Sequence, residues 1–126
     1  MKHPERIEDC LQHIAEAIHR ITGYVQEIDD AAALERDDKT QAAVIRYIEV
    51  IGEAANRIQR QAPEFVTAHP SVPWHEMRGM RNRMIHNYFD VNIDVLWNTV
   101  KDDLPKLKQQ IDPLLIDRKK SATDKQ

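Results

Sequence analysis

Apolar residues recur every three or four positions over three long stretches of the chain, which is the pattern of amphipathic helices. These stretches are residues 7–28, 38–61 and 92–115, and none of them alternates between apolar and polar residues as a half-buried strand does. The positions expected to face a shared core are Ile7, Cys10, Leu11, Ile14, Ile18, Ile21, Val25, Ile28, Val44, Ile45, Ile48, Ile51, Ala55, Ile58, Val95, Leu96, Val100, Leu104, Leu107, Ile111, Leu114 and Leu115.

Short polar residues and prolines mark where these helices begin and end. Asp38 is expected to cap the second helix, and Asp90 or Asn92 the last one, because their side chains accept hydrogen bonds from the unpaired amides of a first turn. Pro63 follows the end of the second helix. Pro105 lacks an amide hydrogen and is expected to kink or restart the last helix.

A shorter helix is predicted between the second and last long stretches. It begins at Pro73 and Trp74, continues to His86 or Asn87, and directs Met77, Met80, Met84 and Ile85 toward the core. Residues 29–39 and 63–73 are expected to be irregular connections. The predicted fold is all-α: an antiparallel four-helix bundle with a short third helix.

The remaining features of the sequence limit the classes of protein it can encode. Its 126 residues are enough for one domain, predicted as a helical unit over residues 1–118 followed by a polar, disordered tail over 119–126. Cys10 is the only cysteine, which is typical of a reducing compartment, so we expect a cytoplasmic protein without membrane segments. Neither a glycine-rich phosphate loop nor paired metal-ligand histidines occur, so no cofactor and no metal are predicted. The net charge of −3 means that contact with RNA requires a local basic patch.

Such a patch occurs at the end of the short helix, where Arg-Asn-Arg-Met-Ile-His-Asn-Tyr-Phe occupies residues 81–89. Arg81 is followed by His86 and then by Tyr88, in the pattern R-x-x-x-x-H-x-Y. An Arg–His pair at one spacing is expected about 0.5 times by chance, but the added tyrosine lowers that expectation to about 0.01. The three-residue pattern is therefore a candidate site.

The chemistry of these residue types fits RNA cleavage. On a continuous helix Arg78, Asn82 and His86 form one polar stripe, because residues four apart share a face. Arg81 and His86 are five apart and differ by about 140° around the helix axis, so Arg81 lies beside the stripe. An imidazole, with an ordinary pKa of about 6.5, transfers protons at neutral pH, and a guanidinium binds phosphate through paired donors. Asn82 would orient His86 or the phosphate. One imidazole cannot readily act as both base and acid, but a two-fold dimer supplies a second copy.

The motif and its surroundings resemble the HEPN superfamily, and within it the HepT toxins. The resemblance covers residues 38–115. The residues that carry it are Ile51-Gly52-Glu53-Ala54-Ala55, Trp74, Gly79-Met80-Arg81-Asn82, His86, Tyr88-Phe89, Trp97 and Asp103-Leu104-Pro105.

This resemblance implies a toxin of a type VII-like toxin–antitoxin pair, acting as a metal-independent endoribonuclease and as a homodimer. Arg81 and His86 would be catalytic, with Asn82 and Arg78 supporting them. The implied partner is a minimal nucleotidyltransferase antitoxin, which would transfer AMP to Tyr88 and could join the homodimer in a larger complex.

Simpler interpretations remain for the same residues. A protonated His86 could interact favourably with the dipole at a helix C-terminus. Arg83 could belong to an ordinary solvated face, and Tyr88 could pack on the last helix. The alternative function is a non-enzymatic helical module that binds a nucleotidyltransferase or RNA without cutting it.

Overall fold

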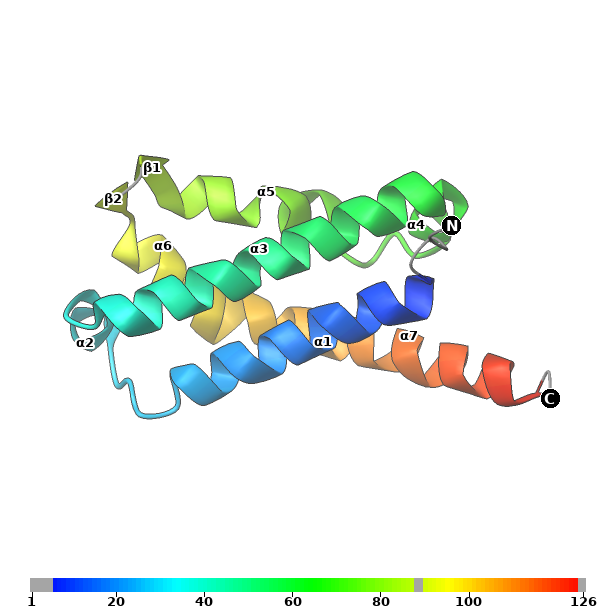
Figure 1. Ribbon diagram of the computed structural model, residues 1–126, viewed down its shortest axis with the longest axis horizontal. Helices are drawn as coiled ribbons and strands as arrows, with labels where there is room; N and C mark the ends of the chain where they lie inside the picture. Colours follow the sequence, from blue (N-terminus) through cyan, green and yellow to red (C-terminus); the bar gives the residue numbers. More distant parts are fainter. Residues whose placement is uncertain (1–5, 88–89, 125–126) are drawn as a thin grey trace, which may run out of the picture.

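The computed structural model describes the backbone of residues 6–87 and 90–124, and the side chains of this part except His86 and those beyond residue 117. Its main helices run alternately up and down along one long axis (Figure 1), as the predicted antiparallel bundle requires. They are α1 (Ile7–Tyr24), α3 (Asp38–Gln61), α5 (Trp74–Met84) and a broken fourth rod of α6 (Ile93–Asn98), the π-helical segment η1 (Thr99–Asp103) and α7 (Leu104–Asp124).

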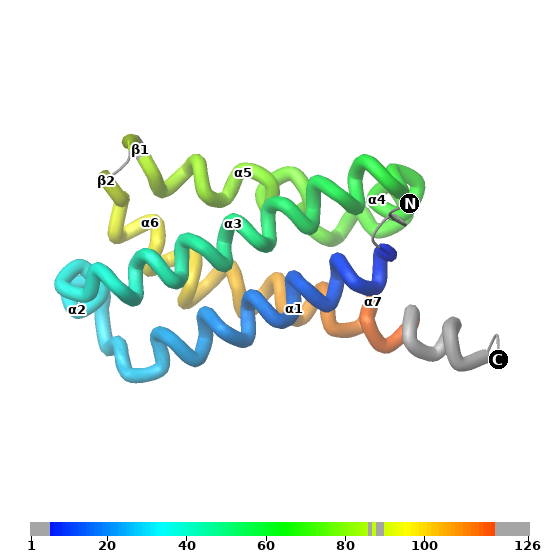
Figure 2. The backbone as a smooth tube through the Cα atoms, viewed as in Figure 1, coloured from blue at the N-terminus to red at the C-terminus, as the bar shows by residue number. Residues whose placement is uncertain are grey.

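The core is shared by α1, α3, α5 and the fourth rod, because buried residues of all four belong to one cluster. The tube in Figure 2 shows α3 running between α1 and α5, and the most extensive helix contacts are those of α1 with α3 and α7 and of α3 with α5. The apolar positions predicted from periodicity are buried or half-buried here, and Met77 and Met84 of α5 have no exposed surface. The predicted core is confirmed.

Two connections contain short helices that the sequence pattern did not predict. Residues 31–35 form α2 (Ala31–Glu35), whose first turn is capped by Asp30 Oδ1 accepting from the Ala33 amide at 2.8 Å. Residues 63–68 form α4 (Pro63–Ala68), with proline in its first turn. Both are too short to show a periodic apolar face, which is why composition alone indicated loops.

The bounds of α3 agree with the sequence prediction better than those of α1 do. α3 has the predicted bounds, although Asp37 and not Asp38 is its N-cap: Asp37 Oδ1 accepts from the Thr40 amide at 3.1 Å. α1 stops at Tyr24 rather than at Ile28, while Val25 is buried and Ile28 half-buried beyond the last turn. The prediction placed the end of α1 too late because the apolar spacing continues for four residues beyond the hydrogen-bonded helix.

The prediction that the third helix reaches His86 is wrong. α5 ends at Met84, and β1 (Ile85–Asn87) pairs antiparallel with β2 (Asp90–Val91) in a small ribbon. The Met84 carbonyl accepts from the backbone amide of Asn92 at 2.7 Å, which extends the pairing of the ribbon to the last residue of α5. Ile85 is β-branched and extended (φ −119°, ψ 119°), and it is packed against the core.

The fourth rod is interrupted where Pro105 predicted an interruption. Asn92 caps α6, with Oδ1 accepting from the Val95 amide at 3.1 Å, whereas Asp90 lies in β2. The π-helical turns of η1 end at Asp103, and Pro105 lies in the first turn of α7, where a missing amide costs little.

The backbone of α7 continues to Asp124, through most of the stretch expected to be a polar, disordered tail. No glycine or proline follows Pro113, so nothing in the local sequence stops the helix. In the described residues, every helix is too short or too polar to cross a lipid bilayer.

Candidate functional site

A groove of about 340 Å³ runs between α3 and α5 and gathers three of the predicted site residues. Buried Ile48, Gly52 and Met77 form its base. Its polar walls are Arg78, Arg81 and Asn82 from α5 and Glu49, Glu53 and Asn56 from α3. Basic and amide groups on one helix thus face carboxylates and an amide on the other.

Gly52 explains how closely the two helices approach. A Cβ atom at this position would lie 3.3 Å from the carbonyl oxygen of Met77 and 3.7 Å from that of Arg78. The first distance is shorter than an ordinary van der Waals contact, so a side chain here would press on the backbone of α5. The glycine in the motif on α3 therefore allows α5 to pack directly on α3 and to present its arginines beside the carboxylates.

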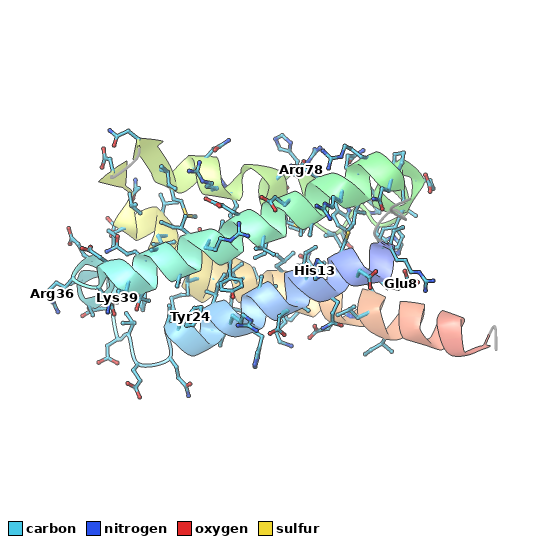
Figure 3. The ribbon with its side chains drawn as sticks, in the orientation of Figure 1. Glu8, His13, Tyr24, Arg36, Lys39 and Arg78 are labelled. Carbon is cyan, nitrogen blue, oxygen red and sulfur yellow. The ribbon has the colours of Figure 1, made fainter. Side chains whose placement is uncertain are left out.

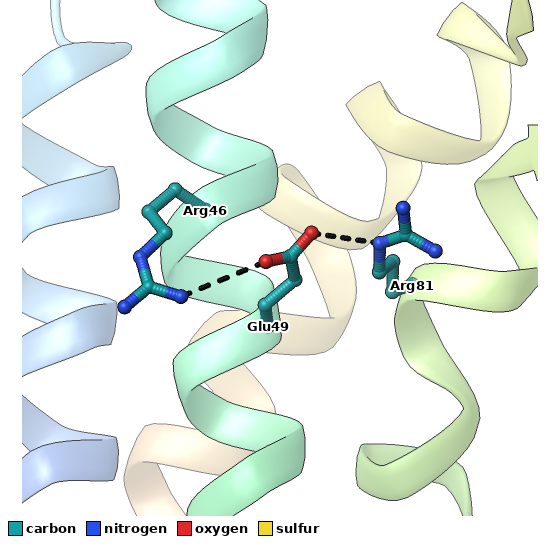
Figure 4. Close-up of polar contacts among 3 residues, drawn as sticks. All are labelled: Arg46, Glu49 and Arg81. Atoms are coloured by element: carbon teal, nitrogen blue, oxygen red, sulfur yellow. Dashed lines mark hydrogen bonds and ion pairs between the residues drawn. The ribbon is translucent and has the colours of Figure 1, made fainter. Parts of the chain in front are cut away.

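Arg81 is held by a carboxylate of the neighbouring helix. Its Nε donates to Glu49 Oε1 at 2.7 Å, and Glu49 Oε2 lies 3.6 Å from Arg46 Nη1 (Figure 4). The Arg81 side chain is 46% exposed and that of Glu49 31% exposed, so solvent reaches this pair. The guanidinium is therefore oriented by a carboxylate without being buried.

Arg78 lies deeper in the same groove. Its side chain lies beside α3 in Figure 3, and its Nε is buried with no hydrogen-bond partner among the described residues. A buried, unpaired donor is costly, so such a group is a natural place for an anionic ligand to bind. Arg83 instead lies on the far side of α5, exposed, with Nη2 donating to the Glu76 carbonyl at 3.4 Å, as expected for an ordinary solvated face.

The predicted stripe on one helix face is correct for Arg78 and Asn82 but not for His86. The backbone of His86 belongs to β1, directly beyond the end of α5, and its side chain lies outside the description. Tyr88 lies outside the described residues. The roles of Arg81, His86 and Tyr88 stay predictions.

Trp74, one of the residues that carry the family resemblance, belongs to the core. Trp74 is 5% exposed, and its Nε1 donates to the His69 carbonyl at 3.0 Å, so its role is structural. Among the side chains that the structure describes, no three His, Cys, Asp or Glu groups lie together as ligands for a metal ion. Sequence reasoning missed Glu49, because it precedes Arg81 by 32 residues and no local pattern joins them.

Comparison with known proteins places the whole groove within one family. The profile described as "Ribonuclease HepT-like" matches residues 14–114. A "Probable ribonuclease HepT" of Thermococcus cleftensis is 46% identical over 109 residues, which are 85% of this chain and 94% of the relative. A "Putative RNase" of Methanocaldococcus jannaschii is 36% identical over 84% of this chain and 94% of the relative. Another "Putative RNase", from Caldanaerobacter subterraneus, is 34% identical over 86% and 90%, respectively.

No solved structure matches the chain. The family match begins within α1, ends within α7, and includes both walls of the groove and the Arg81–His86–Tyr88 motif. By this match over most of its length, the chain belongs to the HepT-like ribonuclease family of the HEPN superfamily.

Proposed function

We propose that this protein is a metal-independent endoribonuclease that works as a homodimer. The observation that carries the proposal is the family match, which spans the groove and the R-x-x-x-x-H-x-Y motif together. An exposed guanidinium fixed by a neighbouring carboxylate, at the end of a helix that leads directly to a histidine, fits recognition of an RNA phosphate.

The proposed reaction is transesterification within RNA. A base removes the proton of a ribose 2′-OH, the 2′ oxygen attacks the adjacent phosphorus, and the bond from phosphorus to the 5′ oxygen breaks. An acid protonates that leaving oxygen, so the products are a 2′,3′-cyclic phosphate and a 5′-OH end. His86 would transfer the protons, and Arg81 would stabilise the negative charge that accumulates on the phosphoryl oxygens.

The homodimer follows from the need for both an acid and a base. The R-x-x-x-x-H-x-Y motif contributes one histidine per chain, and a two-fold interface brings the same surface of two chains together. An interface formed by α5 and the ribbon that follows would place two copies of Arg81 and His86 along one cleft.

Control by a minimal nucleotidyltransferase completes the proposal. The phenol oxygen of Tyr88 would attack the α-phosphorus of ATP, releasing pyrophosphate and the phenolic proton, and leaving AMP on the tyrosine. The added phosphate anion would compete with RNA for Arg81. The chain would then be the toxin of a toxin–antitoxin pair, with the nucleotidyltransferase as the antitoxin.

The test is RNA cleavage in EDTA by the wild type and by Arg81→Ala and His86→Ala. The wild type should produce cyclic phosphate ends. Each variant should lose at least about 100-fold in rate, the scale of one acid–base group for His86 and of one donor to the developing charge for Arg81. Arg20→Ala is the matched control, since Arg20 is an exposed arginine whose Nε also donates to a carboxylate, that of Glu16 at 2.9 Å, on helix α1, which α3 separates from α5 in Figure 2.

Helical content should be unchanged in both variants, because the Arg81 side chain is nearly half exposed and His86 lies outside the helices. Cleavage that stops in EDTA and returns with Mg²⁺ contradicts the mechanism. RNA binding without cleavage by the wild type would favour the non-enzymatic binding module.

A further inference from the structure

Glu49, a carboxylate of the groove, bridges two arginines from two helices. Oε1 accepts from Arg81 Nε of α5 at 2.7 Å, and Oε2 lies 3.6 Å from Arg46 Nη1, three residues earlier on α3. The proposed reaction gives Glu49 no task, since it neither moves a proton nor binds the phosphate. Its two contacts nevertheless determine where the catalytic guanidinium lies.

The contact uses a particular edge of the guanidinium. A guanidinium has five N–H donors on a rigid plane, and one edge carries Nε and a single Nη while the other carries both Nη atoms. Because Glu49 accepts from Nε, it occupies the first edge and leaves the Nη pair directed away from α3. Paired Nη donors match two oxygens of a phosphate.

We propose that Glu49 is a positioning residue: it fixes the Nε edge of Arg81 so that the Nη edge meets the scissile phosphate of RNA. This inference rests on the proposed function for its substrate. Arginine has several rotatable bonds and loses much side-chain freedom when it binds, so a partner that fixes the guanidinium beforehand lowers the entropic cost of reaching the transition state. Arg46 acts on the second oxygen and keeps the carboxylate turned toward Arg81.

A purely structural role for the pair is disfavoured by its exposure. Glu49 and Arg81 are 31% and 46% exposed, and Arg46 is 61% exposed, which is the setting in which ion pairs contribute little to stability. Helix α5 is instead held on α3 by the close approach at Gly52 and by buried Met77. Removing the carboxylate should therefore change the orientation of Arg81 and leave the fold intact.

The opposite role would be competition, in which Glu49 occupies Arg81 and RNA must displace it. The two roles predict changes of opposite sign when the carboxylate is removed. Loss of positioning lowers kcat, whereas loss of a competitor raises kcat/KM. The direction of the change therefore decides between them.

The kinetic test compares Glu49→Gln and Glu49→Ala with Glu16→Gln. Glu16 is the matched control because it also accepts from an arginine Nε, that of Arg20 at 2.9 Å, on the remote helix α1. We expect kcat to fall about 10-fold in Glu49→Gln, whose amide oxygen still accepts, and about 100-fold in Glu49→Ala. KM and Tm should change little, and Glu16→Gln should match the wild type. Rates above the wild type, or equal losses in the Gln and Ala variants, overturn the inference.

A spectroscopic test separates this inference from the proposed function. The Arg81 Nε–H signal in a nitrogen-15 NMR spectrum, assigned by its loss in Arg81→Lys, should exchange slowly with water in the wild type. It should exchange rapidly in Glu49→Ala and remain unchanged in Glu16→Gln. A wild type that does not cleave RNA would refute the proposed function alone, whereas an Arg81 signal that is indifferent to Glu49 refutes the positioning role whatever the RNA assay shows.

Discussion

Gly52 and Gly79 lie on the two facing helices but have different surroundings. A Cβ at Gly52 would lie 3.3 Å from the Met77 carbonyl, whereas one at Gly79 would have no neighbour within 4 Å in the described chain. Gly52→Ala should lower the free energy of unfolding by about 1 kcal/mol, because the backbone of α5 has to move and the gain in helix propensity offsets only part of the strain.

Gly79→Ala is the control, and it should raise the free energy of unfolding by up to about 1 kcal/mol through helix propensity alone. Urea unfolding of both variants measures the difference. Equal stabilisation in the two variants would show that α5 accommodates a methyl group at Gly52 without cost.

Modification of Tyr88 gives a second prediction for a single residue. Incubation with a cognate nucleotidyltransferase, ATP and Mg²⁺ should add one or more AMP units to the wild type and none to Tyr88→Phe, as measured by intact mass. RNA cleavage should fall in parallel, because the new phosphate occupies Arg81. Equal labelling of Tyr88→Phe, or full activity of the labelled wild type, would place control elsewhere.

The residues of the site could be predicted from the sequence only as far as local order extends. Arg78, Arg81 and Asn82 lie within one helical turn or so of each other, and the helix brings them to the same groove. Glu49 could not be found in this way, since its partnership with Arg81 depends on how α3 and α5 pack. Helix packing is determined by contacts across the whole chain, which a short motif does not encode.

Among the elements, α3 begins at a cap whose charge can be titrated. Asp37 Oδ1 accepts from the Thr40 amide and Oδ2 from the Thr40 hydroxyl at 2.7 Å, and these hydrogen bonds lower the pKa of Asp37 below its ordinary value. A carboxylate whose pKa is lower in the folded state stabilises the fold above the unfolded pKa of about 3.9 and loses that effect as the pH falls through the folded value.

The difference in Tm between wild type and Asp37→Ala should therefore be constant from pH 7 to about 5 and shrink as the pH falls below about 4. Thermal unfolding over this range measures it. Asp38→Ala serves as the comparison, because Asp38 is the first residue of the helix and not its cap. A gap that widens in acid would contradict the assignment of Asp37 as a charged cap.

Asn92 holds the ribbon against the start of α6. Its backbone amide donates to the Met84 carbonyl at 2.7 Å, and its side-chain Oδ1 caps α6 by accepting from the Val95 amide. Asn92→Ala should cost about 1 kcal/mol and speed hydrogen exchange over residues 93–98, since only the cap is lost. Asn92→Asp retains the acceptor and should resemble the wild type. Unchanged exchange in Asn92→Ala would refute this role.

The elements that were predicted well are those with repeated apolar spacing. The bounds of α3 and the core positions of every long helix follow from periodicity and were confirmed. The ribbon at 85–91 could not be predicted, because strands of two or three residues show no period and because Ile85 and His86 continue the spacing of a helix. The backbone amide of Asn92, eight residues later, binds the Met84 carbonyl where the helix ends, and this contact leaves no sign in the local pattern.

For the molecule as a whole, the prediction that matters most is its association state. Sedimentation at micromolar concentration should give twice the chain mass of 14.7 kDa, because a complete site requires two copies of His86. Specific activity per chain should fall on dilution below the dissociation constant. A monomer that cleaves RNA at an undiminished rate would mean that one chain holds a complete site.

The π-helical segment η1 should allow the fourth rod to lose one residue while its core positions stay in place. A π turn closes its hydrogen bond over one residue more than an α turn, so it holds one surplus residue while the helices on either side keep their facing. Thr99 and Val100 are buried, but Lys101, Asp102 and Asp103 are exposed. Deleting Asp102 should convert the segment to a regular α-helix and leave Leu104 and Leu107 in the core. The insertion of one residue into a regular α-helix would produce a π turn of this kind.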